Sequence, residues 1–218
     1  MESKLVKLKS DFNNIITVRN NVKNISDILQ LRIDKLSQIY SEFIKTNKNE
    51  MLVFGLDSFP EIEDIEETGA TFEENSLLKA RTISKLTGLP ALADDSGICV
   101  DALNGEPGLY SARYSGNGDA ANNQKLLEAL KDVPDEKRTA YFICVAAFVH
   151  PDGFEKVEEG RFYGKILHEA VGSGGFGYDP LFQPDGLNCS SAELSAEEKD
   201  AISHRGKAMR AIAPYIIG

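Results

Sequence analysis

Two adjacent carboxylates, Asp94 and Asp95, are the residues of this chain best suited to chemistry. They follow the apolar residues 89–93 and come directly before Ser96 and Gly97. Two uncompensated negative charges at the end of a buried strand would be energetically unfavourable. A hard divalent cation such as Mg²⁺ would offset them, because it prefers carboxylate oxygens. The alternative is a solvated turn, in which Gly97 lets the backbone reverse direction.

A second charged group surrounds the start of a predicted helix. Glu67 lies just before this helix and Lys79 lies within it, so the two side chains would face a shared cleft. The simpler interpretation of Glu73 and Glu74 is that they favour the positive end of the helix dipole. For Lys79 the simpler interpretation is a surface pair with Glu74 or Asn75.

The glycine-rich residues 172–177 form a third candidate. Glycines let backbone N–H groups approach a ligand closely and form concave anion sites. The spacing matches neither a Walker A loop nor the dinucleotide fingerprint, so the loop alone is a weak signal. Phe176 would stack on a planar base. Alternatively, the loop is a tight hairpin and Phe176 fills the core.

A basic group near the C-terminus contrasts with the acidity of the rest of the chain. Ser203, His204 and Arg205 lie at a predicted helix start, and Lys199 comes shortly before them. These donors would read carbonyl oxygens or bind phosphates. The alternative for His204 is a structural or solvent-exposed histidine.

Hydrophobic periodicity predicts the elements that must position these groups. Strands are expected at 14–18, 51–56, up to Asp95, 99–103, 139–150 and 154–166. Helices are expected at 24–50, which is unusually long, and at 71–86, 119–131 and 203–217, the second of them with a capping-box-like start at Thr71. This order of strands and helices predicts an α/β protein with a mixed sheet.

Composition limits the class of protein. The chain has 218 residues, of which 42% are hydrophobic, and a net charge of −10. The length suits one globular domain or two closely packed lobes. The acidity opposes general attraction to nucleic acids or anionic membranes. Since Cys99, Cys144 and Cys189 show no metal-binding spacing and no apolar run reaches membrane-spanning length, we expect a cytoplasmic protein with reduced thiols.

Taken together, five ordered segments resemble the inosine/xanthosine triphosphate pyrophosphatase family. They are residues 66–75 with 79–81, 93–97, 107–114, 174–180 and 198–206. A match of this many segments in order is far more specific than any single motif.

The resemblance implies a single domain over residues 1–218 with an elongated mixed β-sheet flanked by helices. Two lobes would enclose a nucleotide cleft, and the chain would form a homodimer. It also implies Mg²⁺-dependent hydrolysis of ITP, dITP and XTP to the monophosphate and pyrophosphate, which clears deaminated purines from the nucleotide pool.

The resemblance further implies roles for particular residues. Glu67 and Asp95 would bind Mg²⁺ with Asp94 beside them, and Asp95 would also accept the proton of the attacking water. Lys79 and Ser96 would contact the phosphates. The base and ribose would be held by Phe176, Gly177, Tyr178 and Asp179, and the purine would be recognised by Lys199, His204 and Arg205.

One region departs from the family pattern. The family's first strand leads into a phosphate loop with a hydroxyl residue, an asparagine and a lysine, and residues 18–23 are the best candidate here. Asn20 and Lys23 keep the spacing, but Val18 replaces the hydroxyl residue. Residues 1–13 would be an extension. The alternative for Asn20 and Lys23 is a turn and a helix start.

Three functions remain open on these observations. The first is the purine pyrophosphatase, because donors aimed at a C6 carbonyl disfavour the amine of adenine. The second, motivated by Val18, is a nucleotide-binding protein with weakened or lost catalysis. The third is a related enzyme acting on modified pyrimidine triphosphates.

Overall fold

The computed structural model describes residues 53–217. The strand predicted at 14–18, the helix predicted at 24–50, and Asn20 and Lys23 lie outside these residues. The chain divides into two compact units, Met1–Ser58 and Phe59–Gly218. The prediction of a single domain over residues 1–218 therefore stays a prediction.

The described part of the first unit differs from the prediction of a strand at 51–56. Residues 53–55 have no regular structure, and the 3-10 helix η1 spans Leu56–Ser58. The N–H of Ser58 donates to the carbonyl of Gly55 over 3.0 Å. This turn bends the backbone at a glycine, and it breaks the run of apolar residues that suggested a strand.

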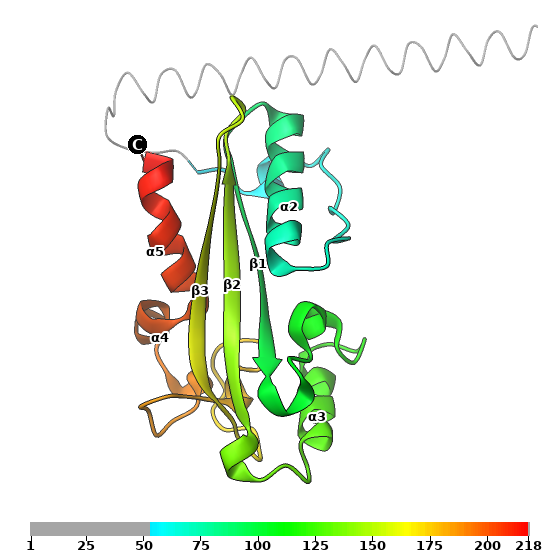
Figure 1. Cartoon of the computed structure of the whole chain (residues 1–218), viewed down its shortest axis with the longest axis vertical. Helices are drawn as coiled ribbons and strands as arrows, with labels where there is room; N and C mark the ends of the chain where they lie inside the picture. Colours follow the sequence, from blue (N-terminus) through cyan, green and yellow to red (C-terminus); the bar gives the residue numbers. More distant parts are fainter. Residues whose placement is uncertain (1–52, 218) are drawn as a thin grey trace, which may run out of the picture. The chain divides into compact units, whose positions relative to one another are not determined.

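The second unit is built on a four-stranded sheet. Its strands are β1 (Ala91–Val100), β2 (Thr139–Val149), β3 (Glu155–Ile166) and β4 (Phe182–Pro184), in the order β1-β2-β3-β4 (Figure 1). All three neighbouring pairs are antiparallel. The predicted α/β architecture of a sheet flanked by helices is confirmed. The mixed character of the sheet stays a prediction, since the described pairs are antiparallel.

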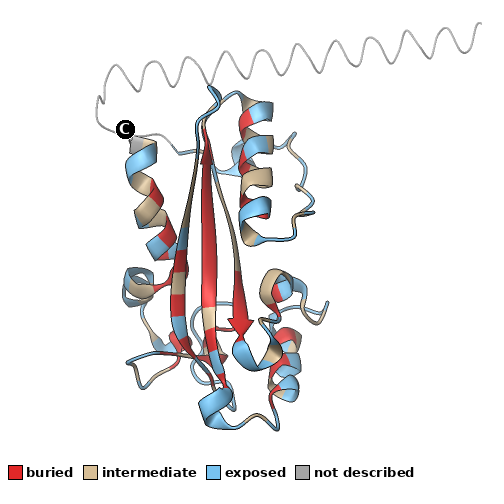
Figure 2. Ribbon diagram, in the orientation of Figure 1, coloured by how far each residue is buried: buried red, intermediate tan, exposed pale blue. Residues whose placement is uncertain are grey.

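Strand β2 is buried along most of its length, as its continuous apolar sequence predicts (Figure 2). Its side chains alternate between two layers. Cys144, Ala146 and Phe148 pack with Ala208 and Ile212 of the C-terminal helix. The intervening residues, such as Ala147 and Val149, pack with Ala80 on the other face.

Helix α2 (Phe72–Thr87) covers one face of the sheet and confirms the helix predicted at 71–86. Thr71 is its N-cap, and the Oγ of Thr71 accepts the Glu74 N–H over 3.1 Å. The Glu74 side chain reaches back to the N–H of Ala70. Gly88 ends the helix in the left-handed conformation, with φ of 68°.

Helices α4 (Ala196–Ile202) and α5 (His204–Ile217) follow one another at the C-terminal end of the unit, and α5 packs on the face of the sheet opposite to α2 (Figure 1). The helix predicted at 203–217 is confirmed. Helix α4 was not predicted, although Ser195 and Glu198 form a capping box at its start.

Strand β1 corrects the prediction of a turn at Gly97. The strand runs without interruption through Asp94, Asp95 and Gly97. A Cβ at Gly97 would lie 2.4 Å from the carbonyl oxygen of Gly108, so the glycine admits the 3-10 helix η3 (Gly108–Arg113) rather than turning the chain. The strand predicted at 99–103 is correspondingly wrong: β1 ends at Val100 and the 3-10 helix η2 (Asp101–Leu103) follows, because the chain turns at Asn104.

The remaining elements close the core at the other end of the sheet. Helix α3 (Asp119–Ala129) confirms the helix predicted at 119–131 and packs Leu126 into this core. Three short 3-10 helices complete the unit: η4 (Asp135–Lys137), η5 (Asp179–Leu181) and η6 (Ser191–Glu193). All three cysteines are free thiols. Within residues 53–217, no helix combines the length and apolarity needed to cross a membrane.

Candidate active site

The two adjacent aspartates of β1 point to opposite faces of the sheet, because successive side chains of a strand alternate. Asp95 faces α2 and contacts Asn75 and Lys79. Asp94 faces α5 and contacts Arg205. The structure therefore places the predicted acidic pair in two separate groups of side chains.

The first group lies between α2 and β1. The Lys79 Nζ lies 2.7 Å from a carboxylate oxygen of Glu67 and 3.6 Å from one of Asp95. Arg113, at the end of η3, approaches the other oxygen of Glu67 to 3.7 Å. The structure thus brings together Glu67 and Asp95, as predicted. Lys79 pairs with both of them rather than with Glu74.

The carboxylate of Asp95 is only 12% exposed. Burial raises the pKa of Asp95 above its ordinary value, and this outweighs the hydrogen bond from Asn75 and the nearby Lys79 ammonium, which both favour the charged form. The charge of Glu67 raises the pKa of Asp95 further. A second cation in this group would hold Asp95 ionised.

The second group lies between β1 and α5. Arg205 donates from Nε and Nη2 to one oxygen of Asp94, over 3.1 and 2.9 Å. The Ser96 hydroxyl donates to the same oxygen over 2.9 Å. Burial alone would raise the pKa of Asp94, but the Arg205 charge and these hydrogen bonds hold it below its ordinary value. Asp94 is thus a fixed anion whose partner is Arg205.

Cys144 of β2 also contacts Asp94, with Sγ 3.5 Å from the carboxylate. Burial raises the pKa of the Cys144 thiol to about 12. This thiol is therefore protonated at neutral pH and acts as a weak donor.

The glycine-rich loop forms a third group. Phe176 is 64% exposed, which excludes the alternative that it fills the core. The Lys199 Nζ lies 4.5 Å from the centre of its ring. Buried Asp179 accepts the Phe176 N–H over 2.8 Å and forms an ion pair with Lys199. An exposed aromatic face is thus held beside a cation.

Two residues of α3 hold this loop from its other side. Asp119 accepts the Gly177 N–H over 2.9 Å, and Asn123 donates to the Gly177 carbonyl over 3.0 Å. Neither residue was predictable as a partner of the loop, because more than fifty positions separate each of them from Gly177. The one feature of the sequence that could have pointed to Asp119 is its position as an acidic residue at the start of a predicted helix.

His204 and Tyr178 are both buried. The His204 ring stacks on Phe142 at 4.9 Å, and its Nδ1 has no hydrogen-bond partner. Burial, together with the charges of Arg205 and Lys199, lowers the pKa of His204 to about 4. The Tyr178 hydroxyl donates to the carbonyl of Ser111 over 2.9 Å, so it is already used inside the protein.

The donor set of the first group suits a hard divalent cation. Mg²⁺ in proteins is commonly bound by one or two carboxylates together with phosphates of the substrate. Glu67 and Asp95 supply two carboxylates that already share one cationic partner, Lys79. Among residues 53–217, no three or more His, Cys, Asp or Glu side chains are arranged to hold a metal on their own.

A hollow of about 650 Å³ also opens beside the start of α2, and it has an apolar floor. None of the predicted site residues lines it. Its walls are formed by Thr71, Phe72, Glu73, Ile143, Val145, Val157, Glu158 and Glu159. It is therefore distinct from the three groups above.

An antiparallel sheet between helices, with Glu67, Lys79 and Asp95 grouped on one face and Asp94 and Arg205 paired on the other, defines an α/β protein with charged side chains clustered on both faces of its sheet. A model of the Ham1 family matches residues 20–215. The chain is 55% identical to the dITP/XTP pyrophosphatase of Streptomyces coelicolor over 164 residues, covering 74% of this chain and 82% of the relative. It is 47% identical to that of Corynebacterium efficiens over 211 residues, covering 93% and 96%.

A solved structure gives the same result. The nucleoside-triphosphatase / dITP/XTP pyrophosphatase of Mycobacterium abscessus is 48% identical, with a TM-score of 0.66, and the match covers 84% of this chain and 94% of that one. The chain belongs to the Ham1 family.

Proposed function

We propose that this protein hydrolyses dITP, ITP and XTP to the nucleoside monophosphate and pyrophosphate, with Mg²⁺ as cofactor. The observation that carries the proposal is the meeting of Glu67, Lys79 and Asp95, which are distant in sequence and lie around one point beside β1. Relatives that cover most of the chain are named dITP/XTP pyrophosphatases, which supports the same substrates.

Each group of side chains has a task in this proposal. Glu67 and Asp95 would hold Mg²⁺, which would neutralise phosphate charge and polarise the reacting phosphorus when bound. Asp95 would take the proton of the attacking water, as the family resemblance implies, because its carboxylate lies beside the position proposed for the cation. The water oxygen forms a bond to phosphorus as the anhydride bond between the α- and β-phosphates breaks.

The remaining groups would bind the nucleotide. Lys79 would contact the phosphates. Ser96 has its hydroxyl on Asp94, on the opposite face of the sheet from Lys79, so its predicted phosphate contact is not part of this group. The phosphate contacts of Asn20 and Lys23 stay predictions, because both residues lie outside the described part of the chain. Phe176, Gly177 and Asp179 would hold the base and ribose, with Tyr178 supporting the loop from the core. Lys199, His204 and Arg205 would donate to the C6 carbonyl of the purine. The amine of adenine cannot accept these hydrogen bonds, so ATP is disfavoured.

An Asp95→Asn variant tests the proposal. We expect its pyrophosphate release from dITP to fall by at least a thousandfold, because the acceptor and a metal ligand are both lost. Asp152→Asn, in the exposed turn between β2 and β3, is the matched control and should retain full activity. The wild-type chain should act on dITP, ITP and XTP far faster than on ATP, GTP or modified pyrimidine triphosphates.

Other outcomes would redirect the proposal. Tight dITP binding without pyrophosphate release above background would establish a binding protein instead. Rapid turnover of modified pyrimidine triphosphates would overturn the assignment of the base. Unchanged turnover by Asp95→Asn would remove this residue from both of its tasks.

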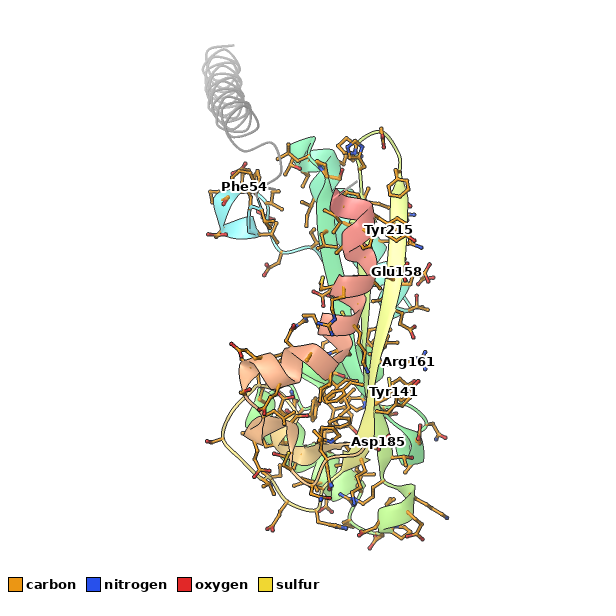
Figure 3. All side chains as sticks on the ribbon, turned by 90° about the vertical axis from the view of Figure 1, so that its left-hand side faces the viewer. Phe54, Tyr141, Glu158, Arg161, Asp185 and Tyr215 are labelled. Carbon is orange, nitrogen blue, oxygen red and sulfur yellow. The ribbon has the colours of Figure 1, made fainter. Side chains whose placement is uncertain are left out.

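We also propose that the chain is a cytoplasmic homodimer, as the family resemblance implies. The free thiols support a reducing compartment. A surface cluster of half-buried Tyr141 and Arg161 with exposed Tyr163 supports the dimer. Tyr141 and Arg161 are labelled in Figure 3. Arg161 lies 4.9 Å from the Tyr141 ring, and Tyr163 is 52% exposed. Tyrosine and arginine are enriched at protein interfaces.

A further inference from the structure

Asn75, in the first turn of α2, has an amide side chain that joins two separate parts of the candidate site. The residue is only 1% exposed. Its Oδ1 accepts the Gly69 N–H over 2.8 Å, and its Nδ2 donates to Asp95 Oδ2 over 3.1 Å. Because the amide is planar and small, these two bonds fix the positions of its partners relative to each other.

The Gly69 contact anchors the segment that carries Glu67. Gly69 lies two residues after Glu67, and a Cβ at this position would lie 2.6 Å from Asn75 Oδ1. The segment can therefore approach the Asn75 amide because Gly69 has no side chain. The adjacent N–H of Ala70 donates to Glu74 over 2.6 Å, which fastens the same segment to the start of α2.

The Asp95 contact orients the other carboxylate. Asp95 Oδ2 accepts from Asn75, whereas Asp95 Oδ1 accepts the Ser96 N–H over 3.1 Å and faces Lys79. One oxygen is thus held in place by Asn75, and the carboxylate plane is fixed. Lys79 also lies between the two carboxylates, but its contact with Asp95 is an ion pair at 3.6 Å, whereas Asn75 is hydrogen-bonded on both sides.

We propose that Asn75 is a positioning residue that sets the spacing and orientation of Glu67 and Asp95 for a divalent cation. The inference rests on the function proposed above. Asn75 contacts Asp95 and the segment that carries Glu67, so it would act through these two carboxylates. Residues that orient metal ligands in this way typically change metal affinity about 10- to 100-fold when they are replaced.

The experiment measures the affinity of the full-length protein for Mn²⁺ without nucleotide, by the electron paramagnetic resonance signal of the free ion. We expect Asn75→Ala to weaken Mn²⁺ binding by about tenfold or more. Asn122→Ala is the matched control. Asn122 is an equally buried amide that binds Ser115 and the carbonyl of Ala112, away from the carboxylates. It should keep the wild-type affinity.

Gly69→Ala disturbs the same contact from the side of the loop and should weaken Mn²⁺ binding as well, so the test does not depend on the folding of one variant. Wild-type Mn²⁺ affinity in either folded variant would overturn the positioning role. The pyrophosphate-release assay on the wild-type chain separates the two proposals. If the wild-type chain releases pyrophosphate but Asn75→Ala keeps the wild-type Mn²⁺ affinity, only the positioning role is refuted. If Asn75→Ala weakens Mn²⁺ binding but the wild-type chain releases no pyrophosphate, only the pyrophosphatase activity is refuted.

Discussion

His204 shows how a predicted binding residue also affects stability. Its imidazole is buried against Phe142, beside Arg205 and Lys199. In the unfolded chain a histidine takes up its proton below about pH 6.5, whereas His204 in the folded chain does so only near pH 4. Between these values the unfolded state binds the extra proton. The folded state is therefore destabilised as the pH falls through this window.

We expect His204 alone to lower the free energy of unfolding by about 2 kcal/mol between about pH 7 and pH 5. Chemical denaturation at the two pH values measures this loss, and His204→Gln should reduce it because glutamine does not titrate. An identical pH dependence in the wild type and in His204→Gln would contradict the low pKa.

At the residue scale, the sequence predicted which types of side chain matter better than which of them meet. Glu67, Lys79 and Asp95 do share one location, as predicted. Asp94 was expected beside them, but the alternation of the strand directs it to Arg205. Asn75 was part of a recognised segment, yet its two partners were not predictable, because both hydrogen bonds depend on how α2 packs against β1.

At the scale of elements, α3 positions the glycine-rich loop. Asp119 and Asn123 bind the N–H and the carbonyl of Gly177 respectively, so one helix face fixes both peptide groups of this glycine. Loops can hold a ligand well only when a rigid element fixes their backbone. We infer that α3 acts on nucleotide binding through this contact.

Asp119→Ala should therefore raise KM for dITP about 3- to 10-fold with a smaller change in kcat, since a hydrogen bond contributes about 0.5–1.5 kcal/mol. Steady-state kinetics of pyrophosphate release measure both constants. Gln124→Ala is the control, because Gln124 lies on the same helix and is exposed. A fall in kcat at constant KM would instead place Asp119 in the chemical step.

The elements themselves were largely predictable from periodicity and capping. The exceptions have physical causes. Gly97 was interpreted as a turn residue. A glycine is required at this position because the carbonyl oxygen of Gly108 lies against it, and this contact exists only in the folded chain. Helix α4 was missed because it is short, although Ser195 and Glu198 carried the signal of its start.

At the scale of the whole molecule, the surface cluster of Tyr141, Arg161 and Tyr163 leads to a prediction about assembly. These side chains lie on neighbouring positions of β2 and β3, and the Tyr141 and Tyr163 rings are 5.7 Å apart. Ile143 and Val145, on the same face of the sheet, are already buried within the protein. A second copy of the chain would cover the cluster of Tyr141, Arg161 and Tyr163.

Analytical ultracentrifugation should find a dimer for the wild-type chain, and Tyr163→Glu should shift it toward the monomer, because a buried unpaired charge opposes association. The same change at an exposed tyrosine outside the cluster, Tyr215→Glu, should leave the dimer intact. A monomer at all concentrations would contradict the homodimer.

The opposite orientation of Asp94 and Asp95 makes the alignment of β1 with β2 decisive for chemistry. Asp95 is paired with Val145 and Asp94 with Ala146. If β1 slipped by one residue along β2, the two aspartates would exchange faces. Asp95 would then face Arg205, and Asp94 would face Lys79. We therefore expect the insertion or deletion of a single residue in β1, before Asp94, to abolish activity although both aspartates are retained.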